Sequence, residues 1–360
     1  MNLKAVALMI TATSFIGTSS ASAKGWSATK VVAASNASTD MKANADAVCT
    51  GTNDETCIQN VLDTLTTGGK LVLSEGTFNL SNALYIGHTS STRENITIQG
   101  QGYGTVLNAQ TNYPIAQTSG ITIKRYAIRD LRIETTTNAG MNALTIRTAL
   151  FSNFENISIK GGSSGTAIYI APDSTTSVLR YTGNCAHNTF RNIDIEETYA
   201  GINLIGNIAG PDHIITLNRF ENISIEGING YGIIITSFAD NNYFSNIHAY
   251  LSTNGSIGVL HNNSSTPAAN VGVYANNFVN LSVDAFGLSN AIGIKFNWTK
   301  QNTVLGFYRS PEMDTENLNG NVLVKDAYSQ SHYILNNAHR SASTPDNNWI
   351  ETISKNVQAR

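Results

Sequence analysis

The sequence predicts an all-β protein coiled as a right-handed parallel β-helix, with a short capping helix at its N-terminal end. Three observations lead to this prediction. The composition is poor in charged residues, at 13%, and rich in turn-forming residues, with 43 Asn and 29 Gly among 360 residues. A motif built on Asn and Phe recurs along the chain. Within each copy the apolar residues alternate with a period of two, as strands require.

The repeated motif reads Asn, any residue, Phe, any residue, Asn, a branched aliphatic residue, any residue and a small or aliphatic residue. One copy begins at Asn188 and carries Phe190 and Asn192. We expect each Phe to point inward and stack on its equivalent one coil away, about 4.8 Å along the axis. The second Asn should turn a corner in a left-handed backbone conformation. The stacked rings would be those of Phe154, Phe190, Phe220, Phe244 and Phe278.

A second short apolar run follows each copy of the motif, after a loop of variable length. Gly201-Ile-Asn-Leu204 and Gly232-Ile-Ile-Ile235 are two of these runs. Because the motif and the run both alternate with period two, each coil is predicted to contain two or three short strands. Amphipathic helices are excluded, since the aliphatic residues lie two apart and most of them are β-branched.

The first 23 residues have the pattern of a secretory signal peptide. Lys4 precedes a short apolar stretch, and a run of small residues ends at Ala23. We therefore expect cleavage near Ala23 and a secreted or periplasmic mature protein. No other stretch of the sequence is long enough to span a membrane.

The rest of the chain is expected to form one large domain with short flanking segments. Cys49 and Cys57 lie eight residues apart and could close a small loop by a disulfide in an exported protein, which leaves Cys185 over. The expected divisions are a linker or N-terminal extension at 24–46, a parallel β-helix domain at 47–335 and a C-terminal cap or tail at 336–360.

The start of the predicted domain has a recognisable order of elements. Asn53 precedes apolar residues at helical spacing up to Leu65, and two glycines then end the predicted capping helix. A strand, Glu75-Gly-Thr-Phe78 and Ile96-Thr-Ile-Gln-Gly-Gln-Gly-Tyr-Gly104 follow. This order resembles the N-terminal region of pectate-lyase-like β-helix proteins, a superfamily of polysaccharide lyases, phage tailspike glycosidases and uronan epimerases. The resemblance spans about residues 47–335, and its motifs are motifs of fold.

Stacked coils place the exposed residues of equivalent strands in columns. On the strand after the corner Asn, Glu196 and Glu226 should be neighbours near 5 Å apart, with Asp194 diagonally close. Carboxylates so close raise one pKa or attract a cation, so Glu196 and Glu226 are candidate metal ligands and Ca²⁺ is the candidate ion. Separations of about 5 to 5.5 Å suit retaining glycoside hydrolysis, and about 6.5 to 9.5 Å suits inversion. The alternative is a set of solvated surface carboxylates without a role.

The Gly-Ile strands form a second exposed face, and the resemblance implies that this sheet lines a substrate groove. The middle of this face is apolar through Ile205, Ile234 and Leu260, a pattern expected of side-by-side packing in a homotrimer or of cover by a loop. Residues of suitable type for binding a polysaccharide occur on both faces and in the adjoining loops. The candidate substrate-binding residues are Tyr169, Asn203, Arg191, Tyr181 and Lys160.

Two reactions on polysaccharides remain open from the sequence. β-Elimination needs a group that neutralises the uronate carboxylate and a base near the C5 proton, whereas hydrolysis needs two carboxylates. The resemblance implies a polysaccharide lyase acting on a uronate-containing glycan; the alternatives are a glycoside hydrolase or a non-catalytic, tailspike-like glycan binder. The net charge of −3 gives no indication of nucleic-acid binding. The candidate catalytic residues are Asp194, Glu196, Glu226, Arg180, His213 and Tyr231.

Overall fold

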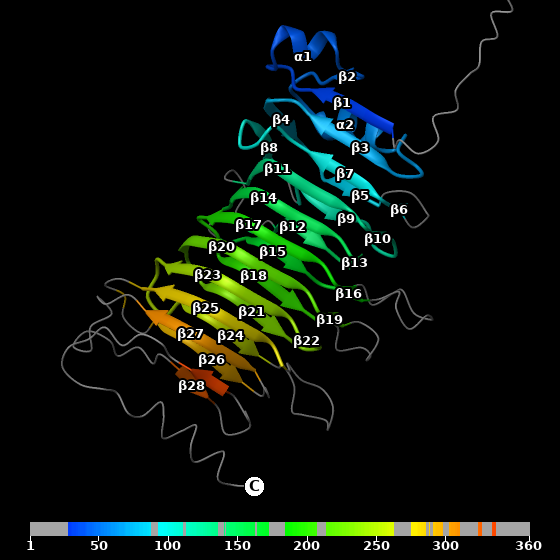
Figure 1. Ribbon diagram of the computed structural model, residues 1–360. Coiled ribbons are helices and arrows are strands. Elements are labelled where there is room, and N and C mark those ends of the chain that lie inside the picture. The colour runs from blue at the N-terminus through cyan, green and yellow to red at the C-terminus, as the bar shows by residue number, and fades with distance from the viewer. Residues whose placement is uncertain are drawn as a thin grey trace, which may run out of the picture.

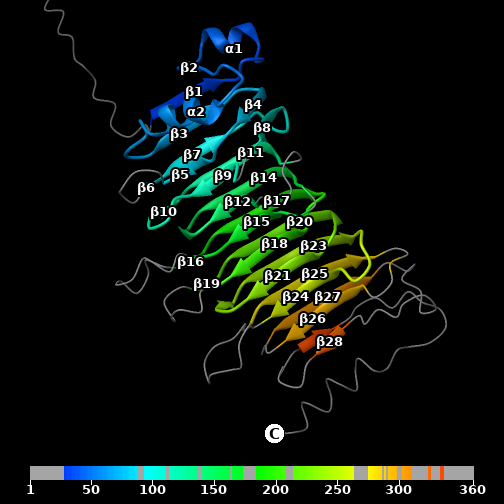
Figure 2. The ribbon, with the colours of Figure 1, turned by 180° about the vertical axis from the view of Figure 1, so that it is seen from behind.

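The chain is a right-handed parallel β-helix, in which every coil adds one strand to each of two or three sheets. Figures 1 and 2 show the strands stacked along one axis, with the helices at the N-terminal end. The computed structural model describes residues 28–87, 93–110, 113–135, 140, 142–162, 164–172, 184–206, 214–262, 275–285, 288, 291–297, 302–309, 323–325 and 333–335.

Sheet 1 is the largest of the three sheets and carries the repeated Asn-Phe motif. Twelve of its strands lie in one path, and β4 and β8 pair beside that path next to β11. In spatial order the path is β2 (Ala47–Val48), β1 (Ala28–Ala33), β3 (Gly69–Leu73), β7 (Ile96–Gln99), β11 (Ala127–Glu134), β14 (Asn153–Lys160), β17 (Thr189–Glu196), β20 (Arg219–Ile228), β23 (Tyr243–Leu251), β25 (Asn277–Asp284), β27 (Thr303–Arg309) and β29 (Tyr333–Leu335). The other two strands are β4 (Gly76–Leu80) and β8 (Thr105–Ala109).

Sheets 2 and 3 complete the coils. Sheet 2 carries the Gly-Ile strands, and sheet 3 is a narrow sheet of two- and three-residue strands. Sheet 2 consists of β5 (Leu84–Ile86), β9 (Ile115–Gln117), β12 (Asn142–Ile146), β15 (Thr166–Ile170), β18 (Ala200–Ile205), β21 (Tyr231–Thr236), β24 (Ile257–Asn262), β26 (Ile292–Asn297) and β28 (Leu323–Lys325). Sheet 3 consists of β6 (Arg93–Glu94), β10 (Thr122–Lys124), β13 (Thr148–Leu150), β16 (Cys185–Ala186), β19 (Ile215–Thr216) and β22 (Ala239–Asp240).

A central coil shows how the sequence turns its corners. The chain runs from β16 through β17 to β18, with left-handed residues at His187 (φ 58°) before β17 and Glu197 (φ 56°) after it. Gly201 opens the apolar run of β18 because the coils approach closely there. A Cβ at this glycine would lie 2.7 Å from the carbonyl oxygen of Gly232 in the next coil. This close contact between backbones explains why the apolar runs begin with glycine.

The predicted aromatic stack is present and forms the centre of the core. The five Phe side chains are at most 1% exposed. Successive ring centroids lie 4.7, 4.8, 4.7 and 4.5 Å apart, and the ring planes are within 10° of parallel. Strand pairing is in register from Phe154 to Phe278, so the ring spacing follows the strand spacing.

The predicted left-handed asparagines are present, but they lie within the strands of sheet 1 and not between strands, since Asn192 falls inside β17 and Asn222 inside β20. Asn192 has φ 53° and Asn222 has φ 55°, the left-handed conformation expected of them. The side-chain amide of Asn222 donates to Oδ1 of Asn192 at 3.1 Å, and that of Asn246 donates to Asn222 at 2.9 Å. Each asparagine thus bonds its equivalent in the previous coil, and the row lies on the solvent side of sheet 1. We call this row the outer asparagine ladder; its members are Asn156, Asn192, Asn222, Asn246 and Asn280.

A second ladder, which the sequence analysis did not anticipate, is formed by the first Asn of each motif copy. Asn188, Asn218 and Asn242 are completely buried at the corner between sheets 3 and 1. The backbone N–H and the side-chain amide of Asn218 both donate to Oδ1 of Asn242, at 3.1 and 3.0 Å. The same amide also donates to the carbonyl of Cys185 at 2.9 Å. These bonds satisfy backbone groups that a sharp buried corner would otherwise leave unpaired.

The N-terminal end departs from the expected domain boundary. The first strand, β1, pairs in parallel with β2 and β3, so residues 28–46 belong to the β-helix and the expected linker at 24–46 was wrong for this part. Val32 and Ala33 of β1 are fully buried, which stabilises this terminal coil. The short run was missed because it carries no repeat motif.

Two helices close the same end. Helix α1 spans Thr39–Ala43, and the predicted capping helix is α2, Asp54–Leu62, which buries Ile58 and Leu62. A disulfide joins Cys49 to Cys57, with 5.7 Å between their Cα atoms. Carboxylates from α2 bond the next coil, since Asp54 accepts from the N–H of Asn79 and Glu55 from that of Ser81, both at 2.9 Å. The cap therefore covers the open end of the core.

The expected signal peptide at 1–23 and the C-terminal segment at 336–360 lie outside the described residues. Among the residues that are described, no helix has the length and apolar character needed to cross a membrane.

Candidate functional site

The predicted columns of charged residues lie on the outer face of sheet 1, beyond the outer asparagine ladder. Asp194 pairs in register with Ser224, and Ser224 with His248. Glu196 pairs with Glu226 on the adjacent strand. Because side chains alternate along a strand, all of these point away from the core, and they are exposed or half-buried. We call this surface the carboxylate face; its residues are Asp194, Glu196, Ser224, Glu226, His248 and Asp284.

Two side-chain hydrogen bonds lie within the carboxylate face. The hydroxyl of Ser224 donates to Oε1 of Glu226 at 3.1 Å, on the same strand. Nε2 of His248 lies 2.8 Å from Oδ2 of Asp284, one coil further on. These bonds fix the orientation of Glu226 and His248 relative to the sheet.

Tyr103 reaches the carboxylate face from the N-terminal coils. It lies in the turn between β7 and β8, and its hydroxyl donates to Oδ2 of Asp194, 91 residues further along the chain, at 2.5 Å. Burial raises the pKa of Tyr103 to about 12, and the hydrogen bond to Asp194 and the charges of Asp194 and Glu196 act in the same direction. The phenol therefore keeps its proton at neutral pH and acts as a donor to this carboxylate.

His248 is the titratable base of the carboxylate face. The hydrogen bond to Asp284 is the largest cause that raises its pKa; partial burial opposes this, and the charges of Asp284 and Glu226 add to the increase. The imidazolium form is thus favoured between two carboxylates. His248 is not among the candidate residues that were named from the sequence.

A bulge changes the predicted column at one point. Pairing between β20 and β23 shifts between Ile225 and Ile228, so Glu226 has no in-register partner on β23. Gly227 takes φ 67° at this bulge, a conformation that glycine adopts without strain. The bulge ends the double column at Glu226, and Tyr250 pairs with Asp284 instead.

The predicted cationic binding residues are already paired with carboxylates. Nζ of Lys160 lies 3.3 Å from Oε1 of Glu197. Arg191 forms an ion pair with Glu155 at 2.5 Å, and it lies before the outer asparagine ladder rather than on the carboxylate face. Neither side chain is directed at the Glu196 and Glu226 pair by these contacts.

The remaining described candidates lie on sheet 2 or at its edge, away from the carboxylate face. Tyr169 and Asn203 pair in register on β15 and β18, as predicted. Burial raises the pKa of Tyr169, and the charge of Arg147 opposes the shift. Tyr231 packs against Tyr199 at 5.6 Å in an edge-to-face arrangement, at the start of β21. The sequence columns thus describe two separate faces.

The apolar strip predicted on sheet 2 is less exposed than expected. Leu260 is only 8% exposed, and Ile205 and Ile234 are half-buried. Beyond Leu260 the row continues in register through Lys295 to Val324. A homotrimer through this strip stays a prediction.

Three candidate residues, Arg180, Tyr181 and His213, lie outside the described residues. Within the described part of the chain, no group of three or more His, Cys, Asp or Glu side chains is placed to hold a metal ion. A calcium site at Glu196 and Glu226 stays a prediction, because two carboxylates supply at most four of the six to eight oxygen ligands that Ca²⁺ takes.

Comparison with known proteins gives similarity of structure at low sequence identity. No family model matches the sequence, and no curated protein matches it. An alginate lyase from Paenibacillus sp. str. FPU-7 aligns with a TM-score of 0.49 and 16% identity over 78% of this chain and 98% of that one. The A-module of a mannuronan C-5 epimerase from Azotobacter vinelandii aligns with a TM-score of 0.47 and 12% identity over 82% and 98%.

A phage protein is similar over part of its length. The tailspike gp49 of the Acinetobacter baumannii bacteriophage Fri1, a capsular polysaccharide depolymerase, aligns with a TM-score of 0.49 and 11% identity. The alignment covers 77% of this chain and 55% of that one.

Proposed function

We propose that this protein hydrolyses a polysaccharide at the carboxylate face. The observation that supports this proposal is the in-register pairing of Glu196 with Glu226 on adjacent parallel strands. Adjacent strands lie about 4.8 Å apart, close to the separation of about 5 to 5.5 Å between the two carboxyl groups of retaining glycosidases. The rigid stack of strands holds the backbones of the two residues at the strand spacing, and we propose that their carboxyl groups lie at a similar separation.

The contacts suggest a role for each carboxylate. Glu226, oriented by the Ser224 hydroxyl, would attack the anomeric carbon. The glycosidic C–O bond would break with its electron pair leaving on the departing oxygen, which takes a proton from Glu196. Water, deprotonated by Glu196, would then attack the same carbon and release Glu226. Asp194, held by Tyr103, would hydrogen-bond sugar hydroxyls beside this pair.

Hydrolysis fits this face better than the β-elimination that the family resemblance implied. Elimination needs a cation to neutralise the uronate carboxylate. Lys160, on the strand beside the carboxylate face, is paired with Glu197, and His248 on the face is paired with Asp284, so these cations are already neutralised. The surrounding carboxylates would repel an acidic glycan. We therefore favour a neutral or weakly acidic polysaccharide as substrate.

The place of action is part of the same proposal. The signal-peptide pattern at residues 1–23 supports export, and a secreted or periplasmic hydrolase would meet polysaccharides there.

The test is incubation of the purified chain with a panel of neutral and uronate-containing polysaccharides. Hydrolysis predicts new reducing ends without unsaturated products. Ultraviolet absorbance from an unsaturated uronate product would instead support elimination. Binding without any cleavage would support the non-catalytic, tailspike-like alternative and reject the hydrolase.

A further inference from the structure

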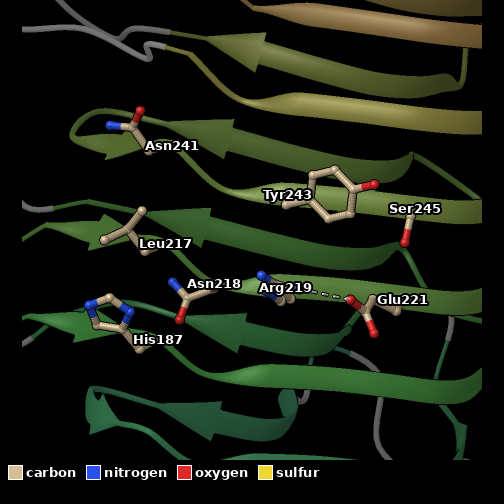
Figure 3. Close-up of a pocket in the computed structure, with 8 residues that line it drawn as sticks. All are labelled: His187, Leu217, Asn218, Arg219, Glu221, Asn241, Tyr243 and Ser245. Carbon is tan, nitrogen blue, oxygen red and sulfur yellow. Dashed lines mark ion pairs between the residues drawn. The ribbon is translucent and has the colours of Figure 1, made fainter.

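A pocket lies on sheet 1 on the opposite side of the outer asparagine ladder from the carboxylate face. It has a volume of about 470 Å³ and is open to solvent. Figure 3 shows that its residues come from successive coils, with His187, Leu217 and Asn241 on the turns and Glu221 on the strand. Tyr243 lies on the strand next to that of Arg219 and Glu221. Strand β20 contributes to both surfaces, through Glu221 to the pocket and through Glu226 to the carboxylate face.

The turn residues at the pocket leave apolar surface exposed. His187 (φ 58°) and Leu217 (φ 56°) take the left-handed conformation that each coil uses at this corner. Leu217 is 48% exposed there, although leucine gains by burial. One coil before, Phe151 is 52% exposed and stacks on His187 with 5.0 Å between ring centroids. Neighbouring exposed apolar groups of this kind are typical of binding surfaces.

The polar groups of the pocket complement its apolar ones. Arg219 is 67% exposed, and its guanidinium lies 3.8 Å from Glu221, close enough for a loose ion pair that leaves other donors free to bind a ligand. Tyr243 is 36% exposed on the adjacent strand. A sugar has apolar ring faces and hydroxyls at its edge, and the pocket offers partners for both. The Tyr243 ring and Leu217 suit the apolar faces. The Arg219 guanidinium, the Glu221 carboxylate and the Asn241 amide suit the hydroxyls.

We infer that this pocket is a second, non-catalytic glycan-binding site. It would hold a segment of polysaccharide with a sugar ring against Tyr243 and Leu217, while Arg219 and Glu221 bond the hydroxyls. We take the ligand to be the polymer that is cleaved at the carboxylate face, and this identity rests on the proposed function. The role of such a site is to keep a long chain bound while the neighbouring face acts on it.

The test is affinity electrophoresis of the full chain through gels that contain dextran, xylan, polygalacturonate or alginate. The wild-type protein should be retarded by at least one of these polymers. Tyr243→Ala should weaken that binding about tenfold, as the loss of an aromatic anchor does, whereas Tyr243→Phe should stay within about twofold. Tyr85→Ala is the matched control, because Tyr85 is 39% exposed and lies on sheet 2.

The outcomes separate this inference from the proposed function. Retardation that Tyr243→Ala leaves unchanged, or no retardation in any gel, would overturn the second site. Absence of new reducing ends would reject hydrolysis but leave the second site standing if Tyr243→Ala still lowers retardation. Release of reducing ends from a short oligosaccharide should be the same in Tyr243→Ala and wild type.

Discussion

Replacing Phe220 by alanine tests the aromatic core most sharply. Phe220 is fully buried and stacks on Phe190 at 4.8 Å and on Phe244 at 4.7 Å. Removal of a buried Phe side chain costs about 3 to 5 kcal/mol, and each aromatic pair adds about 0.5 to 1.5 kcal/mol beyond the area that it buries. We expect Phe220→Ala to lower the free energy of unfolding by about 4 to 5 kcal/mol, near the upper end for a Phe that loses two stacked partners.

The comparison with the end of the stack makes this prediction specific. Phe154 stacks on one ring only, that of Phe190, and pairs with Ile128 on its other side. Phe154→Ala should therefore cost about 1 kcal/mol less than Phe220→Ala. Urea unfolding followed by circular dichroism measures both differences. If Phe220→Ala lowered stability by less than about 1 kcal/mol, the stacked core would be refuted, because no buried Phe in a packed interior costs so little.

Three further predictions concern the ladder, the histidine pair and the cap. Asn222→Ala should lower the free energy of unfolding by about 2 to 3 kcal/mol. Asn222→Gly should lower it by about 1 kcal/mol less, because glycine takes φ 55° without strain. Equal losses for the two variants in urea unfolding would contradict the left-handed conformation. The pKa of His248 is raised in the folded protein, so its stabilising contribution is full below the ordinary pKa of 6.5 and is lost as the pH rises through the higher folded pKa. His248→Phe should abolish that loss. If the free energy of unfolding of His248→Phe varied with pH across this range as that of the wild type does, the pairing of His248 with Asp284 would be rejected. Reduction of the Cys49–Cys57 disulfide should lower the free energy of unfolding by about 2 to 3 kcal/mol. Thermal unfolding with and without reductant measures this difference. A loss below about 0.5 kcal/mol would show that the cap does not fold as one unit with the first coils.

The coil geometry could be predicted because a short repeated sequence motif determines it. Phe190 and Asn192 lie two residues apart, and their equivalents recur in each coil, so strand alternation and stacking fix where both side chains point. The pairing of Glu196 with Glu226 followed from the same rule. Once the motif copies are aligned, each residue between Phe and the end of the strand has its column assigned wherever the register is regular, as from Phe190 to Glu196.

The features that the sequence did not reveal depend on contacts outside the repeat. Tyr103 reaches Asp194 from a turn several coils away, and no periodicity connects them. The bulge at Gly227 inserts a residue that a regular register cannot anticipate. The first asparagine of each motif copy, such as Asn218, was visible in the sequence, but the motif did not show that it is buried. Its role in the ladder depends on that burial at the corner between sheets 3 and 1.

The most direct test of the carboxylate face is the rate of reducing-end release by single variants of its paired glutamates. Glu196→Gln and Glu226→Gln should each lower kcat by at least about 100-fold, the usual contribution of a positioned acid, base or nucleophile. Glu197→Gln is the control, because that exposed side chain is the next residue along and pairs with Lys160 instead. Activity within about twofold of wild type in both glutamine variants would place the chemistry elsewhere on the protein.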